Sequence, residues 1–352
     1  MSTATDVDAA AVGDEDRRRL CALGDAIRDE VLRHRLEQGV ESMAAVVGRV
    51  EADVLYRVDQ VSEARVRAWL DEHWPADRPV RLVMEGVDDH ETVVAPTPAT
   101  PDEAVAVLVI DPVDGTRNLM VDKRSAWALT ALAPARQRGV GGRPEARLGD
   151  IAVAAMTEIP TTKQWRADQL SAVRGCGPDG VVVEGLDVRT GDRHRLPSVR
   201  PSAIAHLDHG FASLANYLPD GKAAIGAIAQ DLFDRLLPPG ESTRQVFEDQ
   251  YICSAGQLHE VMSGRDRLVG DLRPLVLAGI DGLIHPLSCH PYDVCTALLL
   301  EELGGVFEDP RGGPVDVPLD TTTPVAWMAY ANPALAEAIR PVLADVLADH
   351  LR

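Results

Sequence analysis

Residues 110 to 118 read Ile110-Asp111-Pro112-Val113-Asp114-Gly115-Thr116-Arg117-Asn118. The run from Ala104 to Ile110, AVAVLVI, is apolar and rich in Val, which is typical of a strand buried on both faces. Pro112 cannot donate to a β-ladder and Asp114-Gly115 favours a tight turn, so the strand is predicted to end at Asp111. Two carboxylates are therefore expected close together where a buried strand leaves its sheet.

Buried carboxylates that lie close together need a partner, because each loses hydration and the two repel each other. A divalent cation meets both needs, and carboxylate oxygens favour Mg²⁺, Mn²⁺ or Ca²⁺. The amides of Gly115 and Thr116 could then receive a phosphate beside the cation. The alternative is an ordinary strand-to-turn junction in which Asp111 and Asp114 cap backbone amides, and the spacing DxxDG alone does not decide between the two.

The full string DPVDGTRN resembles the signature of the inositol monophosphatase-like family, DP(I/L/V)DGT-x-N. That family contains Mg²⁺-dependent phosphatases of small phosphorylated polyols, sugars and nucleotides. The resemblance covers roughly residues 20 to 345 and implies a mixed α/β (α+β) fold, a layered α-β-α-β-α sandwich, often assembled as a homodimer. We expect a flexible acidic tail over 1–14, an N-terminal domain over 15–200 with most of the metal ligands, and a C-terminal domain over 201–352 that caps the cleft.

A second motif begins His290-Pro291-Tyr292-Asp293 and ends Gly304-Gly305. It resembles the family's C-terminal signature, W-D-x-A followed later by E-A-G-G, with Tyr292 in place of Trp. Asp293 is predicted at the N-terminus of a helix, where it would act as an N-cap. The resemblance implies that Asp293 is also a metal ligand, and one carboxylate can serve both purposes in part.

Glu85 follows the predicted strand 80–84, where the family carries Gly-Glu-Glu, and the resemblance implies that Glu85 bridges two metals. The second Glu is replaced by Gly86, and Asp88 and Asp89 are interpreted as loop residues. Cys289 and Cys295 lie near Asp293 in the sequence, and packing is the expected role of both.

Residues 51 to 63 resemble the family segment that leads into its second helix. Asp59 is a candidate for a third, water-mediated metal site, while Glu63 is expected to make a structural hydrogen bond. The alternative for Asp59 and Glu63 is a structural role as acidic residues in the first turn of a helix, where the helix dipole stabilises negative charge. Where the family carries a Lys before this segment, the chain has Gly48 with Arg49 beside it.

The resemblance implies two or three Mg²⁺ ions, with Mn²⁺ as a possible substitute. Thr116 would orient the attacking water with Asp59, while Gly115, Thr116 and Asp293 would contact the substrate, and Glu85 and Asp111 complete the catalytic group. The implied metal ligands are Glu85, Asp111, the Val113 carbonyl, Asp114, Asp293 and Asp59.

Periodicity predicts helices over 15–38, 61–73 and 221–237, and strands over 80–84, 125–133 and 149–160. Residues 136–147 are interpreted as a surface loop, 181–201 as a polar segment rich in Arg, and 325–343 as a buried strand and a final helix. Ser254-Ala255-Gly256 is a loose match to a family segment that lines the substrate pocket.

Composition bounds the remaining possibilities. The length of 352 residues predicts about two domains, and aromatic residues make up only 4%, so an aliphatic core is expected. The net charge of −20 argues against binding to nucleic acid or anionic membranes, and an anionic substrate needs local positive charge from metal ions and a few Arg or Lys. Five scattered cysteines without CxxC, no signal peptide and no long apolar run favour a cytoplasmic protein.

The sequence therefore predicts a metal-dependent phosphomonoesterase. Fructose bisphosphate or an adenosine bisphosphate is the rival substrate class. The rival function is a non-catalytic family member that binds a metal or a sugar phosphate, or serves as an interaction or regulatory protein. The missing Lys and second Glu favour that rival, as does Pro286, with His285 beside it, where polyol-specific members carry a substrate-binding Glu. Arg244 could contact an anion, but we expect its side chain to be exposed to solvent instead.

Overall fold

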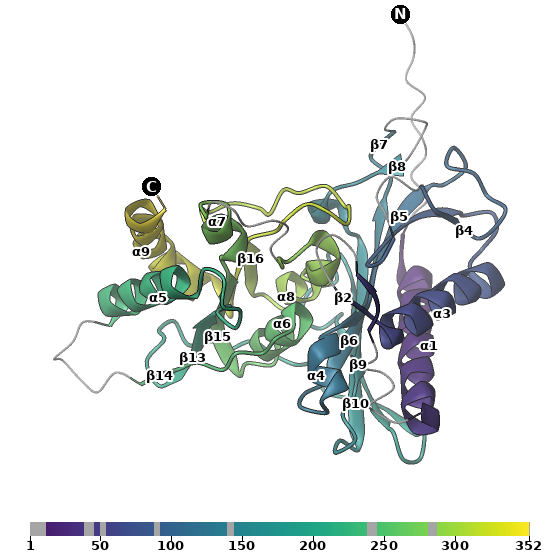
Figure 1. Ribbon diagram of the computed structural model, residues 1–352, viewed down its shortest axis with the longest axis horizontal. Helices are drawn as coiled ribbons and strands as arrows, with labels where there is room; N and C mark the ends of the chain where they lie inside the picture. Colours follow the sequence, from purple (N-terminus) through teal and green to yellow (C-terminus); the bar gives the residue numbers. More distant parts are fainter. Residues whose placement is uncertain are drawn as a thin grey trace, which may run out of the picture.

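The computed structural model describes residues 12–38, 46–49, 54–87, 92–138, 144–237, 245–280 and 287–351, and for residues 38, 46–49, 54–59 and 137–138 it describes the backbone only. Within these ranges two mixed sheets and the helices around them form five layers (Figure 1). The order of the layers is helix, sheet, helix, sheet, helix, which confirms the predicted sandwich.

The first sheet has eight strands in the order β12-β11-β10-β9-β6-β5-β3-β4 within the described residues. Its neighbours are antiparallel except for β3 and β5, which run parallel. The strands are β3 (Val80–Met84), β4 (Val94–Ala95), β5 (Ala106–Asp114), β6 (Ala126–Pro134), β9 (Val153–Ile159), β10 (Arg166–Val173), β11 (Val182–Asp187) and β12 (Arg193–Arg195).

Two long helices, α1 (Asp14–Gln38) and α3 (Arg57–His73), cover one face of this sheet (Figure 1). Alternate residues of β5 point to opposite faces, as the two-residue repeat of a strand requires. Leu108 and Ile110 pack with Leu23 and Leu70 of the helices, whereas Val109 packs in the core on the other side. The strand is buried on both faces, as its apolar run predicted.

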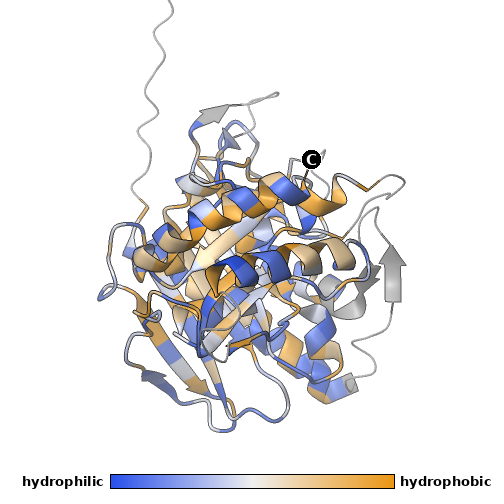
Figure 2. Cartoon of the chain, turned by 90° about the vertical axis from the view of Figure 1, so that its left-hand side faces the viewer, coloured by the Kyte–Doolittle hydropathy of each residue, from blue (hydrophilic) through white to orange (hydrophobic). Residues whose placement is uncertain are grey.

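The second sheet has the order β14-β13-β15-β17-β16, with β13 parallel to both β14 and β15. Helices α5 and α9 cover its outer face, and Figure 2 views the molecule from this side, where hydrophilic and hydrophobic residues lie next to each other along the helices. These elements are β13 (Gly210–Leu214), β14 (Val246–Phe247), β15 (Asp266–Asp271), β16 (Val306–Glu308), β17 (Trp327–Tyr330), α5 (Lys222–Leu236) and α9 (Pro333–His350).

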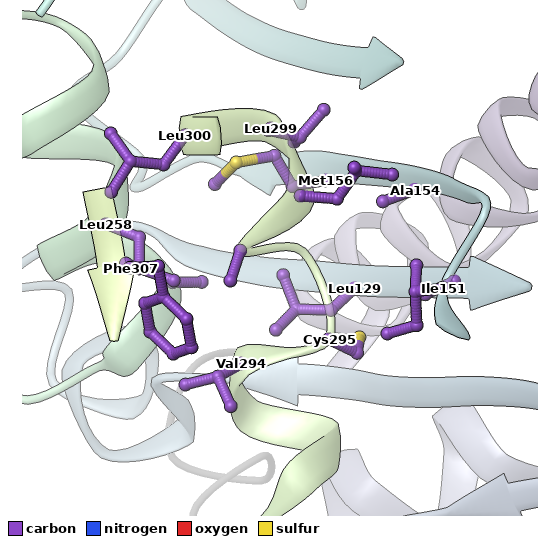
Figure 3. Packing of buried hydrophobic residues seen from close by; sticks show 14 of the residues in the cluster. Leu129, Ile151, Ala154, Met156, Leu258, Val294, Cys295, Leu299, Leu300 and Phe307 are labelled. Atoms are coloured by element: carbon purple, nitrogen blue, oxygen red, sulfur yellow. The ribbon is translucent and has the colours of Figure 1, made fainter. Parts of the chain in front are cut away.

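The central layer lies between the two sheets and contains α6 (Ser254–Met262), the 3₁₀ turn η3 (Pro291–Val294) and α8 (Leu298–Glu302). Figure 3 shows this core, in which Leu129 and Met156 of the first sheet lie in one cluster with Cys295 and Leu299. The short elements α4 (Thr116–Met120), α7 (Arg273–Leu277), η2 (Leu148–Asp150), β1 (Val46–Arg49), β2 (Val54–Tyr56), β7 (Gln137–Arg138) and β8 (Pro144–Glu145) complete the fold.

Several predicted boundaries were wrong. The helix expected from residue 61 begins at Arg57, four residues earlier. The segment 181–201, for which no strand was predicted, forms β11 and β12 at the edge of the first sheet, where polar side chains remain solvated. The residues 136–147 contribute two short strands. The helix expected from Asp293 is divided into η3 and α8. No helix in the described ranges is long and apolar enough to cross a membrane.

Candidate metal centre

The strand β5 was predicted to end at Asp111. It instead continues through a bulge to Asp114. Asp111 pairs with Leu129 of β6 and Asp114 pairs with Trp127, so three steps along β5 oppose two along β6. A bulge leaves a residue without a ladder partner, which explains how a strand tolerates Pro112. The bulge places both carboxylates at the carboxyl end of a buried strand.

Gly115 turns the chain out of the sheet with φ of 97°, a conformation that favours glycine, and α4 begins at the next residue. The predicted site residues around this turn are joined by hydrogen bonds. The Thr116 hydroxyl donates to the Val113 carbonyl at 2.8 Å, and the Val113 amide donates to Asp111 Oδ1 at 3.0 Å. The turn therefore holds the carbonyl, the hydroxyl and a carboxylate in one fixed arrangement.

Asp293 reaches the same place from the central layer, 179 residues further along the chain (293 − 114). Oxygen atoms of Asp111, Asp114 and Asp293 all lie within 4.8 Å of one another. The predicted N-cap role of Asp293 was wrong, because His290 is the N-cap of η3 and Asp293 is its third residue. The Asp293 carboxylate instead accepts from the His290 amide at 2.6 Å, which fixes its orientation.

Burial and the repulsion between like charges dominate the electrostatics of this cluster. Burial raises the pKa of Asp111 well above its usual range, and the charges of Glu85, Asp114 and Asp293 raise it further. Burial also raises the pKa of Asp293, and it raises that of Asp114 to about 6. A divalent cation among these oxygens would neutralise the repulsion, so the residues present fit the predicted metal.

Glu85 lies at the end of β3, beside β5, and its amide donates to the Ile110 carbonyl at 3.3 Å. Its charge acts on Asp111, which places it next to the cluster, although its carboxylate is not one of the three that converge within 4.8 Å. Gly86 follows with φ of 86°, so a left-handed turn occupies the position of the second family Glu.

The N-terminus of α6 is a part of the site that sequence reasoning placed only loosely. The Ala255 amide donates to Asp114 Oδ2 at 2.6 Å, and the Cys253 thiol donates to the Asp114 carbonyl at 3.3 Å. Cys253 is also the N-cap of α6, because its sulfur accepts from the Gly256 amide. The segment around residue 254 thus orients a proposed ligand of the metal. Because this segment is far from residue 114 in the sequence, no local pattern predicted the contact.

A buried arginine, Arg273, was missed altogether. It follows β15, it is 4% exposed, and it forms an ion pair with Asp271 at 2.5 Å. Its charge lowers the pKa of Asp114 and of Asp293, in opposition to burial. No motif in the sequence marks Arg273. An Asp and an Arg two positions apart are common on protein surfaces, so this spacing does not indicate a buried ion pair.

Other predicted residues have mixed outcomes. Glu63 accepts from Arg67 at 3.0 Å, which confirms its structural hydrogen bond. Cys289 and Cys295 are buried in the central core, which confirms packing. The backbone of Asp59 lies in the first turn of α3 and that of Gly48 and Arg49 in β1, but their side chains lie outside what the structure describes. Asp88, Asp89, Arg244, His285 and Pro286 lie outside the described residues.

Comparison with solved structures identifies the fold. Fructose-1,6-bisphosphatase of Leishmania major, in holo form, superposes with a TM-score of 0.64 over 93% of both chains, at 12% sequence identity. Extragenic suppressor protein SuhB of Bartonella henselae gives 0.61 over 94% of this chain and 98% of that one, at 16% identity. The chain has the inositol monophosphatase-like fold.

Staphylococcal IMPase-II also has this fold and matches with a TM-score of 0.56 over 96% of this chain and 99% of that one, at 14% identity. No family model and no curated protein matches the sequence. At such low identity the likeness concerns the inositol monophosphatase-like fold itself, and the chemistry must be argued from the residues at the site.

Proposed function

We propose that this protein is a metal-dependent phosphomonoesterase that hydrolyses a small phosphorylated polyol, sugar or nucleotide. The observation that carries the proposal is the convergence of Asp111, Asp114 and Asp293, three buried carboxylates with oxygens within 4.8 Å of one another. Burial of three like charges is costly unless a cation compensates them. The named phosphatases with this fold support the same conclusion.

In this proposal Asp111, Asp114, Asp293, Glu85 and the Val113 carbonyl hold Mg²⁺, with Mn²⁺ as a substitute and two or three ions in all. Bound divalent cations supply the positive charge that neutralises phosphoryl oxygens, lowers the pKa of the attacking water and steadies the leaving oxygen. Asp59 is proposed to assist through a water, as the sequence predicted.

The chain's own groups position the reactants. The Thr116 hydroxyl donates to the Val113 carbonyl, and a hydroxyl oxygen of this kind can accept a hydrogen bond from a water. The amides of Gly115 and Thr116 would bind the phosphate, and the Asp293 side of the cleft would contact the rest of the substrate. The buried position of Asp111 excludes bulk water and strengthens each of these interactions.

The test is release of inorganic phosphate from inositol phosphates, sugar phosphates, fructose bisphosphate and adenosine bisphosphates, with Mg²⁺ and with EDTA. We expect turnover of at least one ester with Mg²⁺ and none with EDTA. Asp111→Asn should lower the rate by about 100-fold or more, because loss of groups that merely support a metal ligand already costs about 10- to 100-fold.

The second candidate is a non-catalytic protein that binds a metal or a sugar phosphate. The turn at Gly86 favours it, because this position cannot supply the second carboxylate that catalytic relatives carry. Mg²⁺ binding without phosphate release from any ester of the panel would favour this candidate over the enzyme.

We also propose a cytoplasmic homodimer in which residues 15–200 and 201–352 form two domains around the cleft. The five cysteines, all free, fit a reducing compartment. Sedimentation velocity would test the dimer, and limited proteolysis near residue 200 would test the division into domains.

A further inference from the structure

A cavity of about 80 Å³ is lined by η2, η3, α8 and the segment that follows β16. Two backbone hydrogen bonds join that segment to the region of η2. The Leu148 amide donates to the Val317 carbonyl at 3.0 Å. The Leu319 amide donates to the Ala146 carbonyl, also at 3.0 Å. The walls of the cavity are therefore segments that hydrogen bonds hold in place.

The interior of the cavity is apolar. Its buried lining includes Ile151, Val294, Cys295 and Phe307, all of which Figure 3 labels. An apolar cavity accepts an apolar group of matching size, because the lining atoms gain contacts that a void denies them. Since a cavity of about 150 Å³ holds the six carbons of benzene, one of about 80 Å³ holds about three carbons by proportion.

The rim of the cavity carries charges of both signs. Arg174, just after β10, and Glu301 of α8 line it, with side chains that are 42% and 40% exposed. The Arg174 Nε donates to the Ile151 carbonyl at 2.7 Å, which fixes the guanidinium beside the cavity. Nη1 of Arg174 lies 3.3 Å from Oε2 of Glu301, longer than the roughly 2.7–2.9 Å of a close charge-assisted hydrogen bond.

Both members of this ion pair keep capacity to bind a ligand. Within the part of the chain that the structure describes, Nη2 of Arg174 and Oε1 of Glu301 make no hydrogen bond. The neighbouring Glu302 is engaged, because its two oxygens accept from the amides of Gly175 and Gly177, each at 2.7 Å. A ligand at the rim therefore meets one donor and one acceptor next to each other.

We infer that this cavity binds a small zwitterionic amino acid with a branched aliphatic side chain, and that valine, with three side-chain carbons, fits it best. The ammonium group would bind Glu301, the carboxylate would bind Arg174, and the side chain would enter the cavity. An α-amino acid carries its two charges on one carbon, so they lie side by side as the two charges of the rim do. This inference goes beyond the phosphatase proposal and does not depend on it.

The rim disfavours other classes of small ligand. A monocarboxylate would bring its charge close to Glu301, and an alkylamine would bring its charge close to Arg174, so repulsion opposes each of them. A phosphate ester carries up to about two negative charges and would be repelled more strongly by Glu301. An aromatic side chain exceeds the size of about three carbons that the cavity holds.

The test is calorimetric titration of the full chain with L-valine, in Mg²⁺ and again in EDTA. We expect one site in both conditions, with valine bound at least about tenfold more tightly than glycine, which lacks the side chain. Isovalerate lacks the ammonium group of valine and isobutylamine lacks its carboxylate. Each should bind about 10- to 100-fold less tightly than valine, the range for a hydrogen bond to a charged group.

Two variants separate the rim from the interior. Glu301→Gln keeps the size of the side chain and removes its charge, so affinity for valine should fall about 10- to 100-fold while affinity for isovalerate does not fall. Ala297→Leu should abolish valine binding, because Ala297 lines the cavity and a leucine there would fill it. Glu37→Gln is the matched control and should bind valine as the wild type does, since Glu37 forms an exposed ion pair with Arg33 on α1 at 2.6 Å.

Absence of valine binding, or equal affinity for valine and glycine, would overturn the inference. Binding of valine in Mg²⁺ but not in EDTA would place the ligand at the carboxylate cluster and overturn it as well. Should Ala297→Leu fail to fold, Glu301→Gln still decides, because a cooperatively folded Glu301→Gln protein with wild-type affinity for valine would contradict the role of the rim. Phosphate release is not a readout here, so failure of the phosphatase proposal leaves this test intact.

Discussion

Asp111 shows most directly how the site opposes the stability of the fold. It is 1% exposed, and three further carboxylates act on its charge. Its hydrogen bond from the Val113 amide compensates only one of its oxygens. Without a cation, Asp111 raises the free energy of the folded state. It must either carry its charge among like charges, or take up a proton at a pH at which the same carboxyl is ionised in the unfolded chain.

We therefore predict that Asp111→Asn stabilises the metal-free protein while it abolishes metal-dependent activity. Asn keeps the acceptor for Val113 and removes the charge, so thermal unfolding in EDTA should show a higher midpoint temperature than that of the wild type. The control is Asp179→Asn, whose side chain is 98% exposed and which should change stability by less than about 0.5 kcal/mol. A less stable Asp111→Asn protein in EDTA would contradict this account of the site.

His259 gives a prediction for pH. Its ring lies 4.7 Å from that of Trp127, and burial lowers its pKa to about 3 from an ordinary 6.5. Below pH 6.5 the unfolded chain takes up a proton that the folded chain refuses, so stability falls as the pH drops from 6.5 towards 3. Between pH 7 and pH 5 the wild type should lose about 2 kcal/mol through this residue.

The substitution His259→Phe should remove that part of the pH dependence, as measured by urea unfolding between pH 5 and pH 7. His194→Phe, on the exposed edge strand β12, is the control and should keep the wild-type slope. Equal slopes for wild type and His259→Phe would show that His259 is not the titrating group.

At the scale of elements, the turn after β5 is the feature that joins sequence motif and site. Gly115 has a left-handed conformation, and a Cβ there would lie 3.1 Å from the Cys253 sulfur of the α6 cap. An alanine therefore meets two costs, a strained backbone and a contact that pushes α6 away from Asp114. The turn needs glycine for its own shape and for its close approach to the central layer.

We predict that Gly115→Ala lowers stability by about 2–3 kcal/mol and lowers phosphatase activity by at least about tenfold. Gly312→Ala separates the two costs, because Gly312 has φ of 91° with no atom within 4 Å of the added Cβ. That control should lose about 1 kcal/mol and keep full activity. Equal effects of both substitutions on activity would remove the contact with Cys253 from the explanation.

Elements also show how far sequence reasoning reached. The apolar run before Asp111 and the helical periodicity of residues 15–38 are local patterns. Both predicted the right kind of element, although the strand continues past Asp111 to Asp114. The bulge at Pro112 and the break between η3 and α8 depend on neighbouring strands and on packing in the central layer, which no local pattern records. Motifs indicated the proposed ligands Asp111, Asp114 and Asp293. Ala255 lies in a segment that matches the family only loosely, and no motif marks Arg273, so the contacts of these two residues follow from the tertiary structure.

At the scale of the whole molecule, the site depends on how the two sheets are joined. Tyr251 lies between them, and its hydroxyl donates to the Ser125 carbonyl at 2.9 Å at the start of β6. Asn118 donates to the Ile252 carbonyl at 3.0 Å beside it. These bonds hold the segment before α6 against the turn that carries Asp114.

Tyr251→Phe should therefore weaken both the fold and the metal centre. Loss of the hydroxyl leaves the Ser125 carbonyl without this donor, so we expect unfolding free energy to fall by about 1–2 kcal/mol. The apparent affinity for Mg²⁺ should fall as well, because Asp114 loses part of its support. Calorimetry with Mg²⁺ and urea unfolding measure the two effects, and a stable variant with unchanged Mg²⁺ affinity would show that this bond does not organise the site.

The central claim is that Asp111, Asp114 and Asp293 hold a catalytic metal, and anomalous X-ray diffraction from crystals grown with Mn²⁺ tests it most directly. The account predicts an anomalous peak among these three carboxylates, and its loss in Asp111→Asn crystals. Crystals with Mn²⁺ at a concentration that supports phosphate release, but without a peak at this position, would contradict the claim.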